Sequence, residues 1–361
     1  MIDFTQAPNS LCIFRLSAIG DVTHILPVIH TLQKVWPETR ITWIIGRLEY
    51  DLVKSLAGVE FIIFDKSRGW KSYLDLRRQL KGRRFDILLM MQAALRASLT
   101  RFLISAPVKL GFDRQRAVDY QWLFSKQTIQ GDNRVHVLDG LFQFLEAIGI
   151  DEKVYSWELG IDEADQHYAD QAGHYTDERG GHRPYVVINP CSSQRNNNWR
   201  NWSIENYARV ADYLHSKGFQ VYLTGSPALT EIRFCESIAN RCESDPYNCA
   251  GETTLGRLLA LIKDAEFLIA PDTGPAHMAT IVDTPVIGLF ASSNPRRTGP
   301  YKSLDILIDK YPEALQRFNH KSVAEADWGE RVRDPEVMDL IKVEQVTQRI
   351  YSMIAKGLVK H

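Results

Sequence analysis

Three quarters of the way along the chain, the sequence reads Ala270-Pro271-Asp272-Thr273-Gly274-Pro275-Ala276-His277. The apolar residues that precede Pro271 predict a buried strand, and a helical pattern begins at Pro275. Proline is tolerated in the first turn of a helix, because its missing N–H costs nothing there. Thr273 and Gly274 are residue types found at N-caps. The segment therefore predicts a helix whose free N-terminal N–H groups lie at the carboxyl end of a strand.

That arrangement suits an anionic ligand. In an open α/β sheet, ligands bind at the carboxyl ends of the strands, and a helix N-terminus favours phosphate. We therefore expect a phosphate site at residues 272–275. The alternative is an ordinary, well-capped βα turn.

Short apolar runs alternate with amphipathic helical patterns along the whole chain, which predicts parallel sheets covered on both faces. We expect strands at residues 11–16, 41–45, 61–64, 86–91, 185–189, 219–223, 266–270 and 286–290. We expect helices at residues 21–36, 50–56, 73–80, 95–104, 135–148, 204–217, 229–240, 255–264, from 275 onward, and 343–355.

The polar stretch from residue 162 to 183 predicts the end of one domain and a linker to the next. The fold class is therefore α/β, with two doubly wound, Rossmann-like domains facing a central cleft. We expect domains at residues 1–170 and 183–335, and residues 336–361 as a C-terminal helix packing back across the junction.

Composition excludes several classes of protein. Hydrophobic residues make up 45% of the 361 residues and charged residues 24%, which is ordinary for a soluble globular protein. No apolar run is long enough to span a bilayer, and the N-terminus lacks the features of a signal peptide. The five cysteines form no CxxC pair and are odd in number, so we expect reduced thiols in the cytoplasm and no zinc site.

The net charge of −1 conceals a basic region. Between Lys66 and Arg134 there are 15 Lys or Arg, 5 Asp and no Glu, with aromatic residues interleaved. Such a face suits a phosphorylated partner, either nucleic acid or an anionic membrane surface. The alternative is a set of ordinary solvated helix faces.

One turn in the first domain carries candidate chemistry. After the first strand comes Ser17-Ala18-Ile19-Gly20-Asp21, followed by His24. Gly20 would allow a ligand to approach the backbone, and Asp21 is either a carboxylate reaching into the cleft or the N-cap of the next helix. This turn has no GxGxxG, which disfavours an NAD-linked oxidoreductase.

In the second domain, Asn189-Pro190-Cys191-Ser192-Ser193 ends a strand, and Arg200 follows an Asn-rich insert. Hydroxyls and a cation there suit a diphosphate. The turn Thr224-Gly225-Ser226-Pro227 precedes Glu231, whose carboxylate would bind ribose hydroxyls or complement the helix dipole.

Together these segments resemble glycosyltransferase family 9, the bacterial heptosyltransferases of the lipopolysaccharide inner core. The resemblance runs from about Leu11 to Ile354. It is most specific in the Ser-x-x-Gly-Asp turn ending at Asp21, in Asn248-Cys249-Ala250-Gly251, in the segment from Asp272 to His277, and in Thr298-Gly299-Pro300-Tyr301. The stretch from Phe85 to Arg114 looks like the family's acceptor-side region.

The resemblance implies the GT-B fold and an inverting transfer of heptose from ADP-heptose to phosphorylated Kdo-lipid A or the core oligosaccharide. It implies Asp21 and Arg200 as catalytic residues, with Asp21 the general base. It implies that the donor is bound by Ser192, Ser193, Gly225, Glu231, Thr254, Asp272, Thr273, Gly274, Pro275 and His277. It implies that the acceptor is bound by Ser17, Gly20, His24, Arg96 and Arg114.

The resemblance also implies an enzyme that needs no metal or cofactor, because N–H groups and cations can stabilise the leaving diphosphate. We expect a cytoplasmic monomer, peripheral to the inner-leaflet membrane surface, with no nucleic-acid partner. The alternative is a nucleotide-sugar-binding relative with another donor sugar or no turnover. The family often has Lys where Arg200 stands, and the insert from Asn196 to Trp199 is longer than usual. Arg keeps the charge but differs from Lys in geometry.

Overall fold

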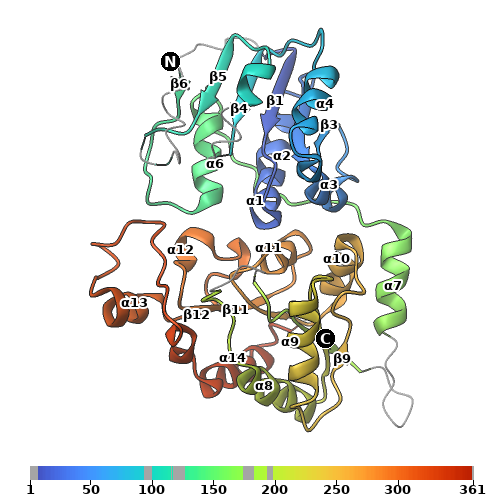
Figure 1. Cartoon of the computed structure of the whole chain (residues 1–361), viewed down its shortest axis with the longest axis vertical. Helices are drawn as coiled ribbons and strands as arrows, with labels where there is room; N and C mark the ends of the chain where they lie inside the picture. The colour runs from blue at the N-terminus through green and yellow to red at the C-terminus, as the bar shows by residue number, and fades with distance from the viewer. Residues whose placement is uncertain are drawn as a thin grey trace. The chain divides into compact units, whose positions relative to one another are not determined.

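Two parallel sheets organise the chain, one in the unit Met1–Gly160 and one in the unit Ile161–His361 (Figure 1). The computed structural model describes residues 7–92, 100–114, 116, 127–173, 183–192 and 198–359. Each unit has its own sheet, covering helices and buried core.

The first sheet has the described strand order β3-β2-β1-β4-β5-β6, and every pair is parallel. The strands are β1 (Ser10–Phe14), β2 (Arg40–Gly46), β3 (Val59–Phe64), β4 (Ile87–Met90), β5 (Val108–Gly111) and β6 (Gln127–Thr128). Central β1 is buried along its whole length. A strand covered on both faces needs apolar residues throughout, which explains its continuous apolar sequence.

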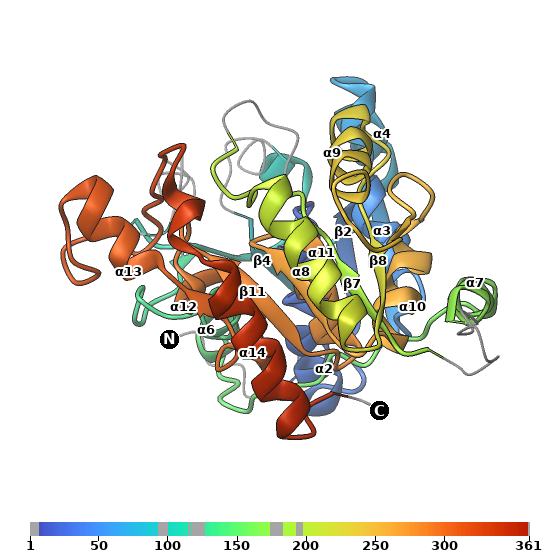
Figure 2. The ribbon, with the colours of Figure 1, turned by 90° about the horizontal axis from the view of Figure 1, so that it is seen from below.

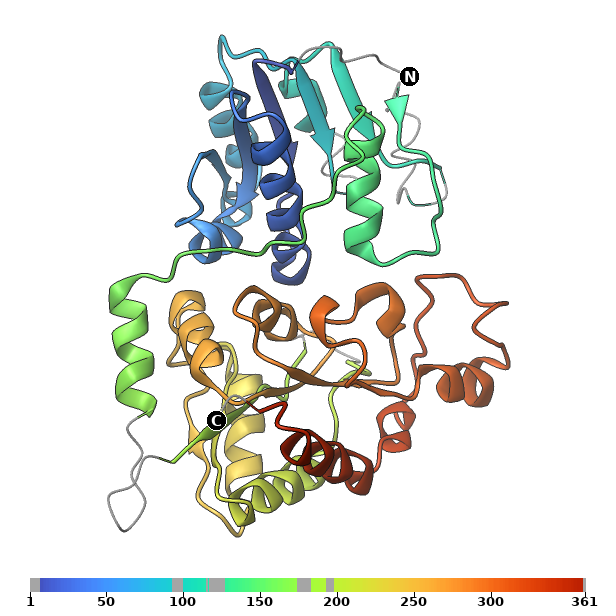
Figure 3. The ribbon, with the colours of Figure 1, turned by 180° about the vertical axis from the view of Figure 1, so that it is seen from behind.

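Helices cover both faces of this sheet. The elements are α1 (Ile19–Thr23), α2 (Ile25–Val35), α3 (Arg47–Val53), η1 (Lys66–Arg68), α4 (Lys71–Gln79), η2 (Arg101–Leu103) and α6 (Val137–Glu146). Leu76 and Leu80, on and just after α4, pack in one cluster with Cys12 and Phe14 of β1. Helices α2 and α6 contact each other, and Figure 3 shows them together on the other face.

The second sheet repeats this topology in the order β12-β11-β10-β7-β8-β9, again with parallel pairs. Its strands are β7 (Tyr185–Ile188), β8 (Gln220–Leu223), β9 (Tyr247–Asn248), β10 (Leu268–Pro271), β11 (Val286–Phe290) and β12 (Ile308–Asp309). The helical elements are α7 (Glu163–Gly173), α8 (Ile204–Ser216), α9 (Leu229–Ala239), α10 (Leu255–Asp264), α11 (Gly274–Ile281), α12 (Pro295–Thr298), η4 (Tyr301–Ser303), α13 (Tyr311–Ala314), η5 (Leu315–Asn319), η6 (Val337–Leu340) and α14 (Val343–Ala355).

Helices α8 and α14 lie side by side on one face of the second sheet (Figure 2 and Figure 3). Val343, Val346, Ile350 and Met353 of α14 are buried in the cluster that contains the apolar face of α8. The C-terminal helix, which we expected across the domain junction, therefore packs in the core of the second unit.

The structure differs from the sequence-based prediction in three further places. The expected linker contains α7, a polar helix that packs against α10 in the second unit, and the contact boundary falls after Gly160. The helix expected at residues 21–36 is two helices, α1 and α2, which meet at His24. The short strands β5, β6, β9 and β12 were not predicted. Half of the helix expected at residues 95–104, residues 95–99, lies outside the described residues.

The five cysteines are free thiols, as expected. Burial raises the pKa of Cys249 to about 12 and that of Cys242 to about 12. Both thiols therefore stay protonated and unreactive at neutral pH.

Gly46, at the end of β2, marks a close approach to the turn after β1. Its N–H donates to the carbonyl of Leu16 at 3.1 Å. A Cβ atom at this position would overlap that carbonyl and the carboxylate of Glu49. The turn that carries Asp21 can therefore lie against β2 only because residue 46 has no side chain.

We predict that Gly46→Ala lowers the free energy of unfolding by about 1–3 kcal/mol, the usual cost of overpacking. Urea denaturation of the two proteins measures the difference. The control is Gly140→Ala in α6, where an added Cβ would meet only Val135 Cγ2 at 3.9 Å. That variant should gain about 0.5–1 kcal/mol from helix propensity. Equal stability of Gly46→Ala and wild type would contradict the close packing.

Candidate functional site

The strand order of the second unit brings two predicted loops together at a topological switch point. Strands β7 and β10 are neighbours, with β8 beyond β7 and β11 beyond β10. Loops that leave such a pair go to opposite sides and leave a crevice where ligands bind. The loop after β7 contains Ser192, and the loop after β10 contains Asp272 and Thr273.

Helix α11 begins at this point with its first turn uncapped by a side chain. Thr273 is the N-cap, with an extended backbone, but its hydroxyl makes no capping bond. The hydroxyl instead donates to the carbonyl of Cys191 at 3.3 Å, which ties the two loops together. Pro275 lies in the first turn, as expected. The remaining first-turn N–H groups thus give the helix N-terminus the character of an anion site.

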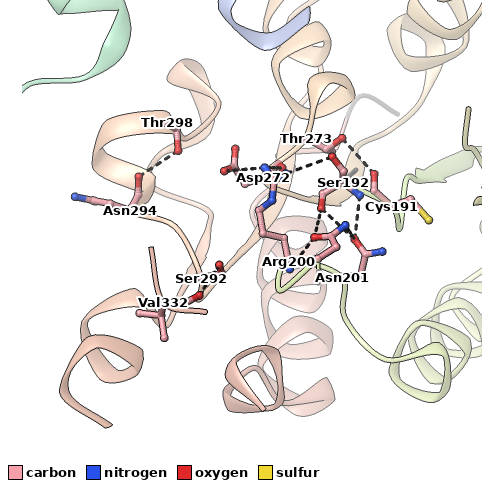
Figure 4. A network of polar contacts seen from close by, with 11 residues as sticks. Cys191, Ser192, Arg200, Asn201, Asp272, Thr273, Ser292, Asn294, Thr298 and Val332 are labelled. Atoms are coloured by element: carbon pink, nitrogen blue, oxygen red, sulfur yellow. Dashed lines mark hydrogen bonds and ion pairs between the residues drawn. The ribbon is translucent and has the colours of Figure 1, made fainter. Parts of the chain in front are cut away.

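Arg200 is held directly at this helix N-terminus (Figure 4). Its Nη1 donates to the backbone carbonyl of Asp272 at 2.8 Å and lies 3.3 Å from the carboxylate Oδ2. Its Nη2 donates to the carbonyl of Ser192 at 3.5 Å. The guanidinium fork therefore spans both loops of the switch point.

Two asparagines organise the loop after β7. Asn201 Oδ1 accepts from the Ser192 N–H at 3.0 Å and from its hydroxyl at 3.1 Å. Asn198 Oδ1 accepts from the same hydroxyl at 2.9 Å and from the N–H of Arg200 at 3.1 Å. Asn201 was missed by the sequence analysis. Ser193 lies outside the described residues.

The other predicted donor-side residues lie on neighbouring elements of the same sheet. Glu231 is buried and accepts from the N–H of Ser226 at 2.8 Å, so its carboxylate closes the turn after β8. A Cβ at Gly225 would lie 3.5 Å from that of Glu231. Thr254 caps α10 by accepting from the N–H of Arg257 at 3.2 Å. His277 is buried in α11.

The first unit places Asp21 at its own switch point, between β1 and β4. Asp21 is the third residue of α1, and its Oδ2 accepts from the N–H of Ala18 at 3.2 Å. The same oxygen lies 2.5 Å from Arg15 Nη2. The side chain is 37% exposed, so the carboxylate both supports the helix start and faces solvent. Helix α1 begins at Ile19, not at Asp21 as expected.

The predicted acceptor-side residues differ in accessibility. The Ser17 hydroxyl accepts from Gln92 at 3.5 Å, and the carbonyl of Gly20 accepts from Thr23 at 2.7 Å. His24 is only 2% exposed and packs edge-on against the ring of His136. Arg114 is exposed after β5. Arg96 lies outside the described residues.

Comparison with known proteins identifies the family. The sequence profile described as glycosyltransferase family 9 (heptosyltransferase) matches residues 73–326. The chain is 42% identical over 343 residues to "Lipopolysaccharide core heptosyltransferase OpsX" of Haemophilus influenzae, covering 95% of this chain and 96% of that protein. This chain belongs to glycosyltransferase family 9. The resemblance in sequence is thereby confirmed, and the protein is a glycosyltransferase.

Solved family 9 structures share its fold. A glycosyltransferase family 9 protein from Veillonella parvula matches with a TM-score of 0.77 at 21% identity, covering 96% of this chain and 97% of that one. E. coli heptosyltransferase WaaC with ADP matches with a TM-score of 0.70 at 17% identity, covering 95% and 99%. The same enzyme with ADP-2-deoxy-2-fluoro heptose matches with a TM-score of 0.65 at 17% identity and the same coverage. The predicted GT-B fold class is confirmed.

Two arginines of this family 9 chain were missed by the sequence analysis. Arg15 is buried at the end of the apolar run of β1, and its Nε donates to the carbonyl of Ser17 at 3.0 Å. It therefore fixes the turn that carries Asp21. A charged residue in an otherwise apolar strand was the available signal. Arg331 keeps part of its surface in solvent, but desolvation of the rest, together with the nearby Arg200, Arg297 and Arg333, lowers its pKa below the ordinary value.

Glu49 is a buried carboxylate close to Leu16, in the turn after β1, that no sequence motif marked. It is 6% exposed, and its carboxylate lies 3.7 Å from Lys66 Nζ. Burial raises the pKa of Glu49, while Lys66 and Arg15 oppose that shift. The folded protein therefore binds the Glu49 proton more tightly than the unfolded chain does.

The described residues contain no group of three or more His, Cys, Asp or Glu that is placed to hold a metal ion. Within the same ranges, no helix has the length and apolar character needed to cross a membrane.

We predict that Glu49→Gln gains thermal stability over wild type at neutral pH and loses that advantage as the pH falls. A raised carboxyl pKa gives stability that is present below the ordinary value of 4.5 and lost as pH rises through the folded pKa. Glutamine removes this titration and keeps the shape. Melting temperatures across the acidic-to-neutral range measure the effect.

Glu60→Gln is the control with the opposite sign, because the hydrogen bond from Arg83 lowers the pKa of Glu60. That variant should be less stable than wild type at neutral pH, by a small amount since the pair is exposed. A Glu49→Gln variant that is least stable at neutral pH would contradict the assignment of burial as the dominant cause.

Proposed function

We propose that this enzyme transfers a heptose from ADP-heptose to an acceptor of the lipopolysaccharide core, with inversion at the anomeric carbon. The observation that carries the donor side is Arg200 bound at the N-terminus of α11, at the switch point of the second sheet. The acceptor side is supported by the name of the 42% identical relative, a lipopolysaccharide core heptosyltransferase.

The donor diphosphate is proposed to lie at the first turn of α11. Helix N–H groups and the guanidinium of Arg200 would stabilise the negative charge that develops on the diphosphate as ADP departs. Arg200 is oriented by Asp272 and by the carbonyl of Ser192, so little reorganisation is needed during the reaction. Solved E. coli WaaC with ADP-2-deoxy-2-fluoro heptose supports this donor class. No metal is required in this proposal.

Asp21 is proposed as the general base. As the acceptor hydroxyl oxygen bonds to the anomeric carbon, its proton passes to the Asp21 carboxylate. The bond from the anomeric carbon to the diphosphate oxygen breaks, and ADP leaves on the opposite side. Arg15 holds Oδ2 at 2.5 Å, which fixes the direction of the carboxylate while its 37% exposure leaves it open to an acceptor.

The acceptor is proposed to be phosphorylated Kdo-lipid A or a core oligosaccharide built on it, presented at the inner leaflet to a cytoplasmic, peripheral enzyme. Arg114, exposed after β5, would bind its phosphate or carboxylate groups. The net positive charge between residues 66 and 134 favours an anionic acceptor of this kind through long-range attraction, and Arg114 is the one cation of the region proposed to contact it.

Release of ADP from ADP-heptose in the presence of Kdo-lipid A tests the proposal directly. The expected result is ADP release that depends on both substrates. Faster ADP release from an ADP-hexose than from ADP-heptose would indicate another donor sugar. Tight binding of ADP-heptose with no release of ADP would indicate a nucleotide-sugar-binding protein without turnover.

We predict that Asp21→Asn lowers kcat by ~10²–10⁴-fold, the usual contribution of a general base. The amide keeps an oxygen that can accept from Ala18, so the melting temperature and the affinity for ADP should change little. Steady-state kinetics and isothermal calorimetry measure these quantities. Asp75→Asn, which breaks the pair of 2.5 Å between Asp75 of α4 and Arg68 of η1, is the matched control and should keep full activity. Wild-type turnover in Asp21→Asn would exclude it as the base.

We predict that Arg200→Ala lowers kcat/KM for ADP-heptose by ~10²-fold. A guanidinium that donates hydrogen bonds to a developing negative charge acts mainly in the transition state. The KM for the acceptor should stay unchanged. Arg200→Lys should restore only part of the loss, since one ammonium cannot span both Asp272 and Ser192. Arg209→Ala, an exposed cation of α8, is the control. An effect confined to the acceptor KM would place Arg200 on the acceptor side instead.

A further inference from the structure

The outer surface of α4 in the first unit carries exposed apolar side chains. Trp70, at the N-cap of α4, is 69% exposed, and Leu74 is 48% exposed. They are four residues apart and so lie on the same side of the helix. The opposite side packs in the core through Leu76 and, just beyond the helix, Leu80. Trp70 and Leu74 are therefore not part of the fold's hydrophobic core.

Cations surround these two side chains. Residues 66–84 contain eight Lys or Arg, all of them exposed: Lys66, Arg68, Lys71, Arg77, Arg78, Lys81, Arg83 and Arg84. Asp75 is the only acidic residue in that stretch, and it pairs with Arg68 at 2.5 Å and Arg78 at 4.0 Å. Across the part of the chain that the structure describes, four of the cations form neither an ion pair nor a side-chain hydrogen bond: Lys71, Arg77, Lys81 and Arg84.

A second exposed aromatic residue lies over the same core cluster. Leu103 of η2 and Ala106 pack against the cluster that Leu76 and Leu80 enter. Phe102, next to Leu103, is 70% exposed. Two separate elements that cover one face of the sheet thus present large apolar side chains to solvent.

We propose that this outer face, made of Trp70, Leu74 and Phe102 with the cations of residues 66–84, binds an anionic lipid bilayer surface. Tryptophan, phenylalanine and leucine flanked by Lys and Arg are the composition of helices that lie in the membrane interface. The unpaired cations contact the headgroups, and the long Lys and Arg stems let the apolar side chains reach the acyl boundary. A nucleic-acid surface would use aromatic residues for base stacking but has no use for Leu74.

The proposed membrane-binding face and the candidate base Asp21 lie at the same edge of the first sheet. Helix α4 follows β3, so its N-terminal end, with Trp70, lies at the carboxyl edge of the first sheet. Asp21 follows β1 and lies at that same edge. This part of the inference rests on the proposed function, because it brings a lipid-borne acceptor hydroxyl to the edge that carries the base.

Co-sedimentation of the full chain with phosphatidylcholine vesicles, with and without about 30 mol % phosphatidylglycerol, tests the inference. Wild type should bind only the anionic vesicles, and less as salt rises. Lys71→Gln, Arg77→Gln, Lys81→Gln and Arg84→Gln combined should lower the partition coefficient by about 10²–10³-fold. The control combines Arg209→Gln, Lys217→Gln, Arg233→Gln and Arg241→Gln, exposed cations of the second unit. It should bind like wild type.

Quenching by brominated lipid tests whether Trp70 enters the interface. The chain has 8 Trp, so the difference between wild type and Trp70→Phe isolates this one. Quenching should fall in the variant. Three results would overturn the inference: an equal loss of vesicle binding in the combined variant and its control, equal binding of wild type to neutral and anionic vesicles, or unchanged quenching in Trp70→Phe. If the combined variant of residues 71–84 lost binding to an oligonucleotide but kept binding to anionic vesicles, the face would be assigned to nucleic acid and the inference would also be overturned.

Transfer to a soluble, delipidated acceptor separates this inference from the proposed function. The combined Gln variant of Lys71, Arg77, Lys81 and Arg84 should keep wild-type kcat with that acceptor and show a raised KM only with the lipid-borne one. If wild type transfers heptose to neither acceptor but binds anionic vesicles through this face, the proposed function fails and the membrane surface stands.

Discussion

The pairing of β7 with β10 is the constraint on which the proposed donor-side arrangement depends. The two strands are about 80 residues apart in sequence, yet Ile188 is in register with Ile269, and Asn189 donates to Ile269 at 2.9 Å. Only this pairing places the loop after β7 beside the N-terminus of α11. The bonds from Thr273 to Cys191 and from Arg200 to Asp272 then fix the two loops to each other.

The first unit connects the two loops of its switch point in a similar way, through Arg15. There β1 pairs with β4, and Met91 donates to the carbonyl of Phe14 at 3.1 Å. Arg15 donates to the carbonyls of Met91 and Ser17 and also pairs with Asp21. In each unit an arginine spans the two loops of the switch point. In one unit it orients the proposed base, and in the other it is proposed to meet the leaving group.

The sequence was sufficient for the features that depend on local pattern. Continuous apolar runs predicted the central strands, and the residues around Thr273 predicted the start of α11. The two-residue strands β6, β9 and β12 are too short to show any period. Helix α7 has little apolar periodicity and is held by polar contacts such as Gln166 with Asp264 at 2.7 Å, so its sequence resembled a linker.

The residues near the candidate sites that the sequence did not predict are brought there by contacts between segments distant in sequence. Glu49 lies against the turn after β1 because β2 brings Gly46 to Leu16, 30 residues earlier in the chain. Arg331 comes near Arg200 and Arg297 because Val332 pairs with Ser292 at the end of β11. Neither position carries a local motif. The identity of Arg200 was visible in the sequence, but the two loops that its guanidinium spans became visible only in the fold.

The bond from Trp202 to the carbonyl of Ile341, at 3.1 Å, has a consequence for how the protein is made. Trp202 lies two residues after Arg200, and Ile341 leads into α14, whose apolar face completes the same core. A chain still emerging from the ribosome has synthesised every proposed donor-side residue long before this support exists. The order of the loop that carries Arg200 is therefore coupled to the arrival of the last helix, and nascent or C-terminally clipped chains are expected to bind the proposed nucleotide sugar less well.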